Sequence, residues 1–226
     1  MNPKEFLAMK KVFSLFLVLI TLNSYSQTPI DYDNFDSDLA SKILGQKFIE
    51  FRDTITQYGH GATLFDGWLP YLEDNQDLLV PQWCDYLYEN LSKYNCGKMM
   101  ENKRHEAGHI DREKWFDSDK TKSDLGEIMF KGTIIPESKW GIYTYSMRYG
   151  ENSCSLQSKF KTYEELALHI INGYENSIMH RCAQRGIIHD VTIYRNYGVK
   201  IYGLFSCCVM YDKETKITKS VLNMVN

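Results

Sequence analysis

The pattern that most constrains the fold lies in the last third of the chain, where a helical segment leads directly into β-rich runs. Residues 162–180 carry an apolar side chain every three or four positions and begin with a capping-box sequence. Residues 191–194 and 200–211 are rich in β-branched and aromatic side chains, and residues 195–198 between them contain the Asn and Gly of a turn. This order predicts an amphipathic helix followed by an antiparallel hairpin.

Two further helices are predicted in the first half of the chain. Residues 38–58 have apolar side chains at steps of three and four, with Asp36 or Ser37 available as the N-cap. Pro81 suits the first turn of a second helix, which we expect to end near residues 95–97.

The remaining segments complete an α+β pattern. Residues 98–125 are rich in charged side chains, so we expect a surface excursion there. Residues 140–147 alternate in the manner of a strand. Helices that are followed by strands, with one helix between the strands, predict an α+β domain in which helices flank an antiparallel sheet.

The first residues have the features of an export signal. Three lysines precede an apolar run at residues 12–22, and small residues then offer a cleavage site near Ser26 and Gln27. The run is too short for a comfortable membrane span of about 20 residues. We therefore expect residues 1–26 to be a signal peptide, and the mature chain to be exported to the periplasm or secreted, with no transmembrane segment.

Charge argues against one class of partner. Removing residues 1–26 takes away three lysines and one glutamate, so the net charge of −3 becomes −5. A chain with this acidic balance is a poor match for nucleic acid. About 200 residues would remain, which suits one domain with a sizeable core.

Cysteine usage leaves two interpretations open. Six cysteines in an exported chain favour disulfides, although fifteen pairings are possible and none can be deduced. Cys207 and Cys208 lie in a predicted strand and should point to opposite faces, with Cys182 a reasonable partner for one of them. The alternative is that several cysteines are simply small buried hydrophobes. The six are Cys84, Cys96, Cys154, Cys182, Cys207 and Cys208.

One short motif suggests a zinc site. His105 and His109 flank Glu106 in an H-E-x-x-H sequence, in which two histidines on one helix face bind zinc and the glutamate polarises a metal-bound water. Glu127 could supply a third ligand. The flanking residues are strongly charged, and Gly108 weakens a helix by about 1 kcal/mol relative to alanine. The same stretch is also typical of a solvated loop.

Four segments, in their order along the chain, carry a resemblance to a known family. They are Phe-Ile-Glu-Phe-Arg at 48–52, the helix at 81–94, Gly-Glu-Ile at 126–128, and Tyr-x-x-Ser-x-x-His-Arg at 174–181. They resemble the first helix, the second helix, the Gly-Glu-Asn-aliphatic motif and the bacterial Trp-x-x-Ser-x-x-His-Arg pattern of the CAP superfamily. This superfamily, also called the SCP domain, contains cysteine-rich secretory, venom allergen and pathogenesis-related proteins. Ile128 stands in place of the asparagine and Tyr174 in place of the tryptophan.

The resemblance implies an architecture and a division of the chain. The architecture is an α-β-α sandwich, in which helices flank a central antiparallel sheet. It would occupy residues 38–226, after an N-terminal linker at residues 27–37. Residues 133–160 would be an inserted segment, because they are longer than the usual link in the family.

The resemblance also implies a cleft lined by His180, Glu127 and an upstream histidine, for which His109 is preferred to His105. Ser177 and Tyr174 belong to the same motif and would lie beside it. In some members of the family, paired histidines bind a divalent metal, so His109 and His180 are the implied ligands. No enzymatic activity follows from the fold alone.

Three hypotheses follow from the sequence. The first is a ligand- or surface-binding module whose partner is an extracellular component, without established catalysis. The second is a zinc peptidase that uses His105, Glu106, His109 and Glu127. The third is a disulfide-stabilised interaction domain with no site, in which His180 has no fixed place. Independently of these hypotheses, His180 could simply interact with the negative end of a helix dipole.

Overall fold

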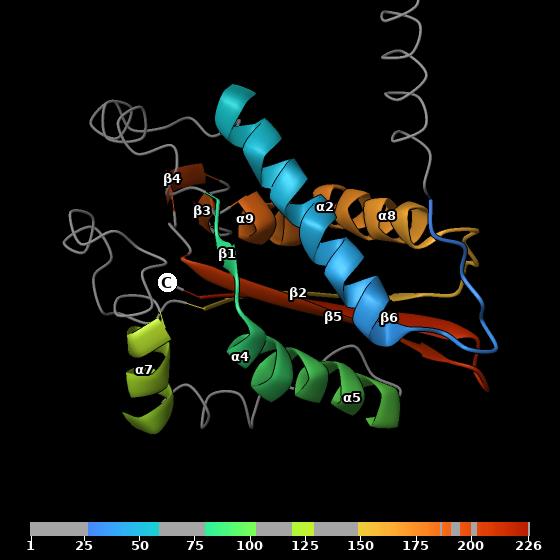
Figure 1. Cartoon of the computed structure of the whole chain (residues 1–226). Helices are drawn as coiled ribbons and strands as arrows, with labels where there is room; N and C mark the ends of the chain where they lie inside the picture. Colours follow the sequence, from blue (N-terminus) through green and yellow to red (C-terminus); the bar gives the residue numbers. More distant parts are fainter. Residues whose placement is uncertain are drawn as a thin grey trace, which may run out of the picture.

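The computed structural model describes residues 27–58, 80–102, 119–128, 149–185, 187–190, 195–199 and 203–225. Within these ranges the chain forms three layers, with helices on both faces of a β-sheet (Figure 1). The expected α+β class and α-β-α sandwich are thereby confirmed. The strand predicted at residues 140–147 and the H-E-x-x-H sequence lie outside the described residues.

The central sheet has four strands in the order β1-β5-β6-β2. Strands β5 (Leu204–Asp212) and β6 (Ile217–Val225) form an antiparallel hairpin, and β2 (Tyr149–Leu156) pairs antiparallel to β6. Strand β1 (Gln82–Trp83) pairs parallel to β5 over two residues. The sheet is therefore mixed, although three of its strands are antiparallel as expected.

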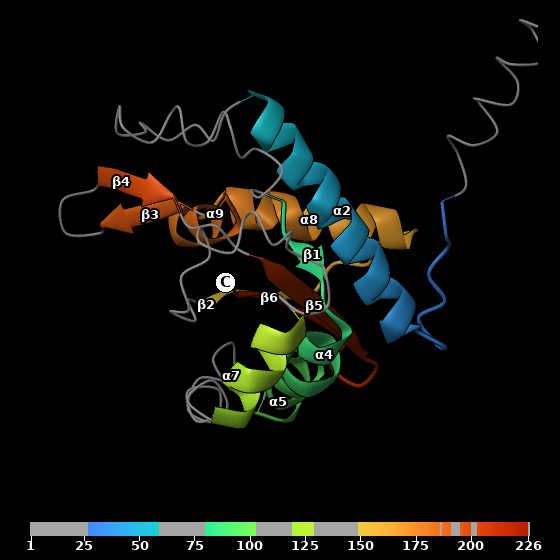
Figure 2. The same cartoon turned by 60° about the vertical axis from the view of Figure 1, so that its left-hand side comes forward.

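Two long helices cover one face of the sheet. Helix α2 (Ser37–Tyr58) crosses β5, and α8 (Tyr163–Glu175) lies beside α2 (Figures 1 and 2). The other face is covered by a continuous helical segment made of α4 (Asp85–Leu87), a π-helical turn η2 (Tyr88–Ser92) and α5 (Lys93–Asn102). This segment starts later and ends later than the sequence predicted, because residues 82–83 form β1 and the helix continues through Gly97.

Smaller elements extend both helical layers. Helix α7 (Asp119–Gly126) lies next to α4, where Tyr86 Oη donates to Asp124 Oδ2 at 2.9 Å. Helix α9 (Ile178–Arg185) follows α8 and leads into a second, two-stranded sheet of β3 (Ile187–Asp190) and β4 (Arg195–Val199). Residues 27–36, expected to be a linker, instead pack on the start of α8: Thr28 N donates to Glu164 Oε2 at 2.9 Å.

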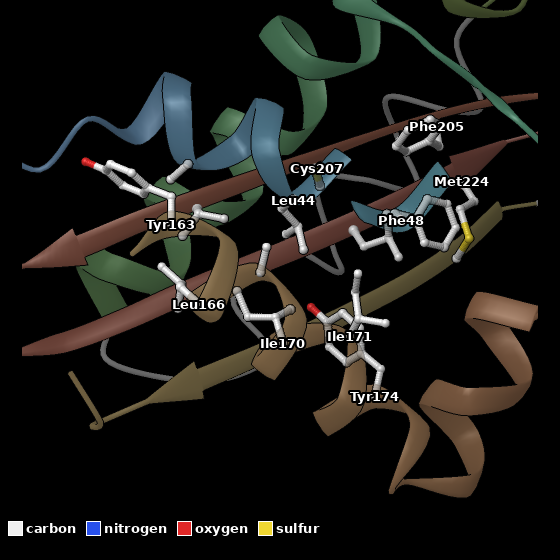
Figure 3. Close-up of a cluster of buried hydrophobic side chains, with 14 residues drawn as sticks. Leu44, Phe48, Tyr163, Leu166, Ile170, Ile171, Tyr174, Phe205, Cys207 and Met224 are labelled. Carbon is white, nitrogen blue, oxygen red and sulfur yellow. The ribbon is translucent and has the colours of Figure 1, made fainter. Parts of the chain in front are cut away.

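The main core lies between the sheet and the layer of α2 and α8 (Figure 3). Leu44 and Phe48 of α2 meet Ile170 and Ile171 of α8 above the inner face of the sheet. Leu44 and Phe48 are four residues apart, and Ile170 is four residues from both Leu166 and Tyr174, as the apolar periodicity predicted. The buried cluster consists of Ala40, Leu44, Phe48, Tyr163, Leu166, Ala167, Ile170, Ile171, Tyr174, Phe205, Cys207, Val209, Leu222 and Met224.

A smaller core lies on the opposite face of the sheet. Cys208 and Val221 pack there against Tyr88, Cys96 and Met99 of the α4–α5 segment. Because Cys207 belongs to the main core, the two neighbouring cysteines point to opposite faces, which confirms the expectation from strand alternation.

Helix α2 also satisfies backbone groups of β5 beyond the end of β1. Ser41 Oγ accepts a hydrogen bond from Val209 N at 2.9 Å, and the Ser41 carbonyl accepts one from Cys207 Sγ at 3.1 Å. All three residues are buried. An unpaired buried amide costs free energy comparable to a lost hydrogen bond, so a serine at this position performs the role of a neighbouring strand.

The late helical segment differs from the prediction. A continuous helix over residues 162–180 is wrong, because α8 ends at Glu175 and α9 begins at Ile178. Asn176 and Ser177 between them have low helix propensity, and the Ser177 carbonyl accepts from Arg181 N at 2.7 Å to start α9. His180 therefore lies in the first turn of a short helix, and the helix-dipole explanation for it does not apply.

The predicted hairpin turn is also wrong. Residues 195–198 lie within strand β4, and the turn of the main hairpin is at residues 213–216. There the Asp212 carboxylate accepts from Glu214 N at 2.9 Å, and Lys216 adopts a left-handed backbone with φ of 57°. The side chain of Asp212 thus supplies the turn geometry that Asn and Gly usually provide.

Two helical glycines should respond oppositely to substitution. A Cβ at Gly45 of α2 would lie 2.8 Å from Trp83 Cζ3, whereas a Cβ at Gly97 of α5 would have no neighbour within 4 Å. We expect Gly97→Ala to raise the free energy of unfolding by about 0.5–1 kcal/mol through helix propensity. Gly45→Ala should lower it by about 1–3 kcal/mol, because Trp83 must shift. Chemical denaturation of both variants checks this, and a change of the same sign would contradict it.

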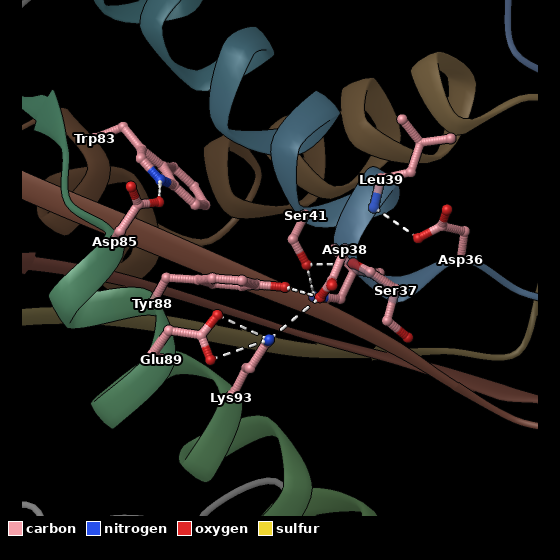
Figure 4. Close-up of polar contacts among 11 residues, drawn as sticks. Asp36, Ser37, Asp38, Leu39, Ser41, Trp83, Asp85, Tyr88, Glu89 and Lys93 are labelled. Carbon is pink, nitrogen blue, oxygen red and sulfur yellow. Dashed lines mark hydrogen bonds and ion pairs between the residues drawn. The ribbon is translucent and has the colours of Figure 1, made fainter.

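A hydrogen bond at the start of α2 should contribute stability that depends on pH (Figure 4). Tyr88 Oη donates to Asp38 Oδ1 at 2.6 Å, and this bond, assisted by Lys93, holds the pKa of Asp38 below its usual value. The contribution is therefore present above the unfolded pKa of about 3.9 and is lost as the pH falls through the folded pKa.

We expect Tyr88→Phe to lower the free energy of unfolding at pH 7 by up to about 1 kcal/mol, since the Asp38 carboxylate is largely exposed. The difference from wild type should shrink on acidification below pH about 4. Urea denaturation across this pH range, in a double-mutant cycle with Asp38→Asn, measures the effect. A loss that persists unchanged at low pH would show that the phenol acts through packing alone.

Candidate functional site

A pocket of about 460 Å³ lies between the edge strand β2 and helix α8. Residues of α9 and β6 complete its wall. This volume is within the range of small-molecule sites in proteins. The described part of the chain therefore offers a site built on four elements, of which β6 is distant in sequence from the other three.

The body of the pocket is apolar. Leu156 of β2, Ile170 of α8 and Ile217 of β6 line it, together with the ring of Tyr174. Gly173 of α8 also lines it, and a Cβ at this glycine would have no neighbour within 4 Å. The absence of a side chain at position 173 thus leaves room beside the helix.

Polar residues from several elements line the pocket. Imidazoles come from α8 and α9, an ammonium from β6, and hydroxyl and thiol groups from β2. These residues are His169, His180, Lys219, Ser153, Ser155 and Cys154. Such a combination, a few polar groups on a largely apolar wall, is typical of ligand sites.

Lys219 is the most unusual of these residues. Only 5% of it is exposed, and no ion pair joins it to a carboxylate among the described residues. In the antiparallel register it stands directly opposite Ser155, so the two side chains share one face at the edge of the sheet. A buried ammonium normally has a partner, since an isolated charge is costly to remove from water.

The wall next to α8 contains a buried hydrogen-bonded network. Tyr174 Oη and Ser220 Oγ share a hydrogen bond of 3.0 Å, and Ser220 Oγ shares another of 2.9 Å with Cys154 Sγ. Burial raises the pKa of the Tyr174 phenol and of the Cys154 thiol. Both groups are therefore protonated at neutral pH, and Cys154 has the character of a buried thiol rather than of an activated nucleophile.

His180 is fixed from the side of the strand. Asn152 Nδ2 donates to the His180 carbonyl at 2.8 Å, and the imidazole lies 5.6 Å from the Tyr174 ring, measured between centroids. His180 is half-buried. Asn152 thereby ties the first turn of α9 to β2 across the inner end of the pocket.

Charged groups hold α8 and α9 at a fixed angle. The guanidinium of Arg185 in α9 donates to Glu175 at the end of α8, with Nε 2.9 Å from Oε2. Arg52 of α2 is fully buried and donates to the Gln184 carbonyl at 2.8 Å. The break at residues 176–177 is therefore held by contacts on both sides, which sets the position of His180.

The structure separates two residues that the sequence analysis placed in one cleft. Glu127 follows α7 and is exposed, and α7 lies on the α4 side of the sheet. His180 is in α9, on the side of α2 and α8, and both views agree on this arrangement (Figures 1 and 2). The structure does not bring the carboxylate of Glu127 to the imidazole of His180.

The other predicted site residues have different outcomes. Tyr174 and His180 both line the pocket. Ser177 is half-buried between α8 and α9, where its carbonyl starts the second helix. His105, Glu106 and His109 lie outside the described residues. Among the residues that are described, no three His, Cys, Asp or Glu side chains are grouped to hold a metal ion.

Sequence reasoning missed Lys219, His169 and Cys154 as pocket residues. Lys219 carried a signal, since the apolar residues Ile217 and Val221 stand two positions to either side of it. Strand periodicity shows only that such a residue is buried on one face. The neighbour that makes it part of a pocket is β2, whose Ser155 pairs opposite Lys219 although it is 64 residues earlier in the chain.

The cysteines whose side chains are described are all free thiols. They are Cys84, Cys96, Cys154, Cys207 and Cys208. The Cys182 side chain lies outside the described part of the chain. Because Cys207 and Cys208 are both free, the expected pairing of Cys182 with one of them is wrong.

Comparison of the chain with protein-family models, with known proteins and with solved structures finds no match. Within the described ranges, no helix combines the length and apolar composition needed to cross a membrane.

The link between Asn152 and α9 can be tested directly. Asn152→Ala removes the donor to the His180 carbonyl, so we expect the free energy of unfolding to fall by about 1–3 kcal/mol and the His180 ring signals to shift. Asn172→Ala on the exposed face of α8 is the matched control and should stay within about 0.5 kcal/mol of wild type. Denaturation and NMR of both variants decide, and equal effects would contradict the assigned role.

Proposed function

We propose that this protein is an exported α-β-α module that binds a small organic molecule in the pocket between β2 and α8. The observation that carries the proposal is the coincidence of an open pocket of about 460 Å³ with a nearly buried Lys219 on its wall, which pairs with no carboxylate among the described residues. The predicted signal peptide at residues 1–26 supports the exported location.

The chemistry of the wall favours binding over catalysis. Burial raises the pKa of the Cys154 thiol, whereas a nucleophilic cysteine needs a lowered one. Tyr174 is engaged with Ser220 and is also protonated. These groups can orient a ligand through hydrogen bonds, and the apolar side chains can exclude water from it.

The proposal retains the first hypothesis from the sequence but moves its site. The CAP-type order of elements remains a prediction, and the His180 and Tyr174 of its motif belong to the proposed pocket. Glu127 does not. The zinc peptidase remains a prediction that depends on residues 105–109, outside the described part of the chain.

The proposal predicts that filling the pocket from α8 abolishes binding. In ¹⁵N-labelled protein, a library of small organic fragments should give amide shifts that cluster on β2, α8 and β6. Gly173→Trp should remove these shifts, because position 173 opens into the pocket. Gly97→Trp is the matched control, since it is also an open helical position but lies on the other layer.

Two results would overturn the proposal. One is that no fragment produces shifts at the pocket. The other is that Gly173→Trp and Gly97→Trp bind fragments equally. Melting temperatures of the two variants show that both are folded.

A further inference from the structure

We propose that the pocket selects organic anions, in which a carboxylate or phosphate head group pairs with Lys219 while an apolar chain lies along Leu156 and Ile170. This inference rests on the proposed function and deepens it, because it names the class of ligand. It comes from the composition of the wall rather than from its size.

The charge on Lys219 favours an anionic ligand. Only 5% of Lys219 is exposed, yet it has no carboxylate partner in the described part of the chain. Desolvating an ammonium without a partner is unfavourable. Since the residue lines the pocket, a ligand anion can supply the missing charge and recover this cost.

Other residues of the pocket wall can donate hydrogen bonds to an anion. Ser155 stands opposite Lys219 in the register, and Ser153 is two residues along the same strand. Their hydroxyls can donate to the oxygens of an anion. The imidazoles of His169 and His180 line the pocket on its α8 and α9 side and add N–H donors there, and no Asp or Glu among the described residues lines it.

The two faces of β2 present different side chains to the pocket. Strand alternation places Cys154 and Leu156 on the face of β2 toward α8, and Ser153 and Ser155 on the opposite face. The pocket therefore follows the outer edge of β2 and offers an apolar side and a cationic side. A ligand that is charged at one end and apolar at the other matches both.

The experiment compares three probes with the same eight-carbon chain: 1-octanol, octanoate and octyl phosphate. Titrations followed by calorimetry and by amide shifts should show that at least one anion binds about ten- to a hundredfold more tightly than the alcohol. Octanoate and octyl phosphate distinguish the two head groups. The preferred anion identifies the natural chemistry.

Substitution of the lysine supplies the decisive comparison. Lys219→Met keeps the volume and removes the charge, so the anions should lose their advantage while 1-octanol binds as before. Lys219→Arg keeps the charge and should retain the preference. Melting temperatures establish that both variants fold.

The outcomes separate this inference from the function on which it rests. If the alcohol binds as tightly as both anions, or if Lys219→Met leaves the preference unchanged, the anion site is wrong and the binding pocket stands. If none of the three probes binds, the charged amphiphile is wrong, and the fragment library with Gly173→Trp judges the pocket independently.

Discussion

The structure depends on the contact between α2 and β5. Strand β1 pairs with only the first two residues of β5, so the rest of that edge needs another cover. Ser41 accepts from the amide of Val209 and, through its carbonyl, from the thiol of Cys207. Leu44 and Phe48, further along the same helix, then pack on the inner face of the sheet. Helix α2 thus covers both the free edge of β5 and part of the inner face of the sheet.

The position of α2 determines the position of the pocket. With α2 over β5, helix α8 lies beside α2, and its Tyr174 reaches β2 and β6 through the Asn152 carbonyl and the Ser220 hydroxyl. Arg52 of α2 reaches α9 through the Gln184 carbonyl, and the ion pair of Glu175 with Arg185 keeps α9 turned from the axis of α8. His180 is consequently directed to the wall formed by β2, and the gap left by Gly173 remains open.

The sequence predicted those features that depend on local periodicity. Helix α2 begins one residue before its predicted start, with Asp36 accepting from Leu39 N at 2.9 Å. Thr162 accepts from Glu165 N at 3.2 Å, as its capping-box position indicated. These elements were accessible because an apolar stripe and a cap are encoded within about 20 residues.

The features that the sequence missed depend on partners distant in the chain. The break between α8 and α9 at Asn176 is stabilised by Arg185 and Arg52. These two residues are too far apart in the sequence to belong to one helical pattern. The turn after Asp212 has neither Asn nor Gly, and its geometry comes from a carboxylate bonded to the following amides. Lys219 belongs to a pocket only because Ser155 of β2 pairs opposite it. For these residues, tertiary contacts outweigh local preference.

The place of β2 at the margin of the sheet has a dynamic consequence. Among the described strands, the backbone of β2 pairs with β6 alone, whereas β6 has a strand on each side. Amide protons of β2 should thus exchange with solvent faster than those of β6, because less structure must open to release them. A molecule bound between β2 and α8 would connect this strand to the helix. Its binding should therefore slow amide exchange along residues 149–156.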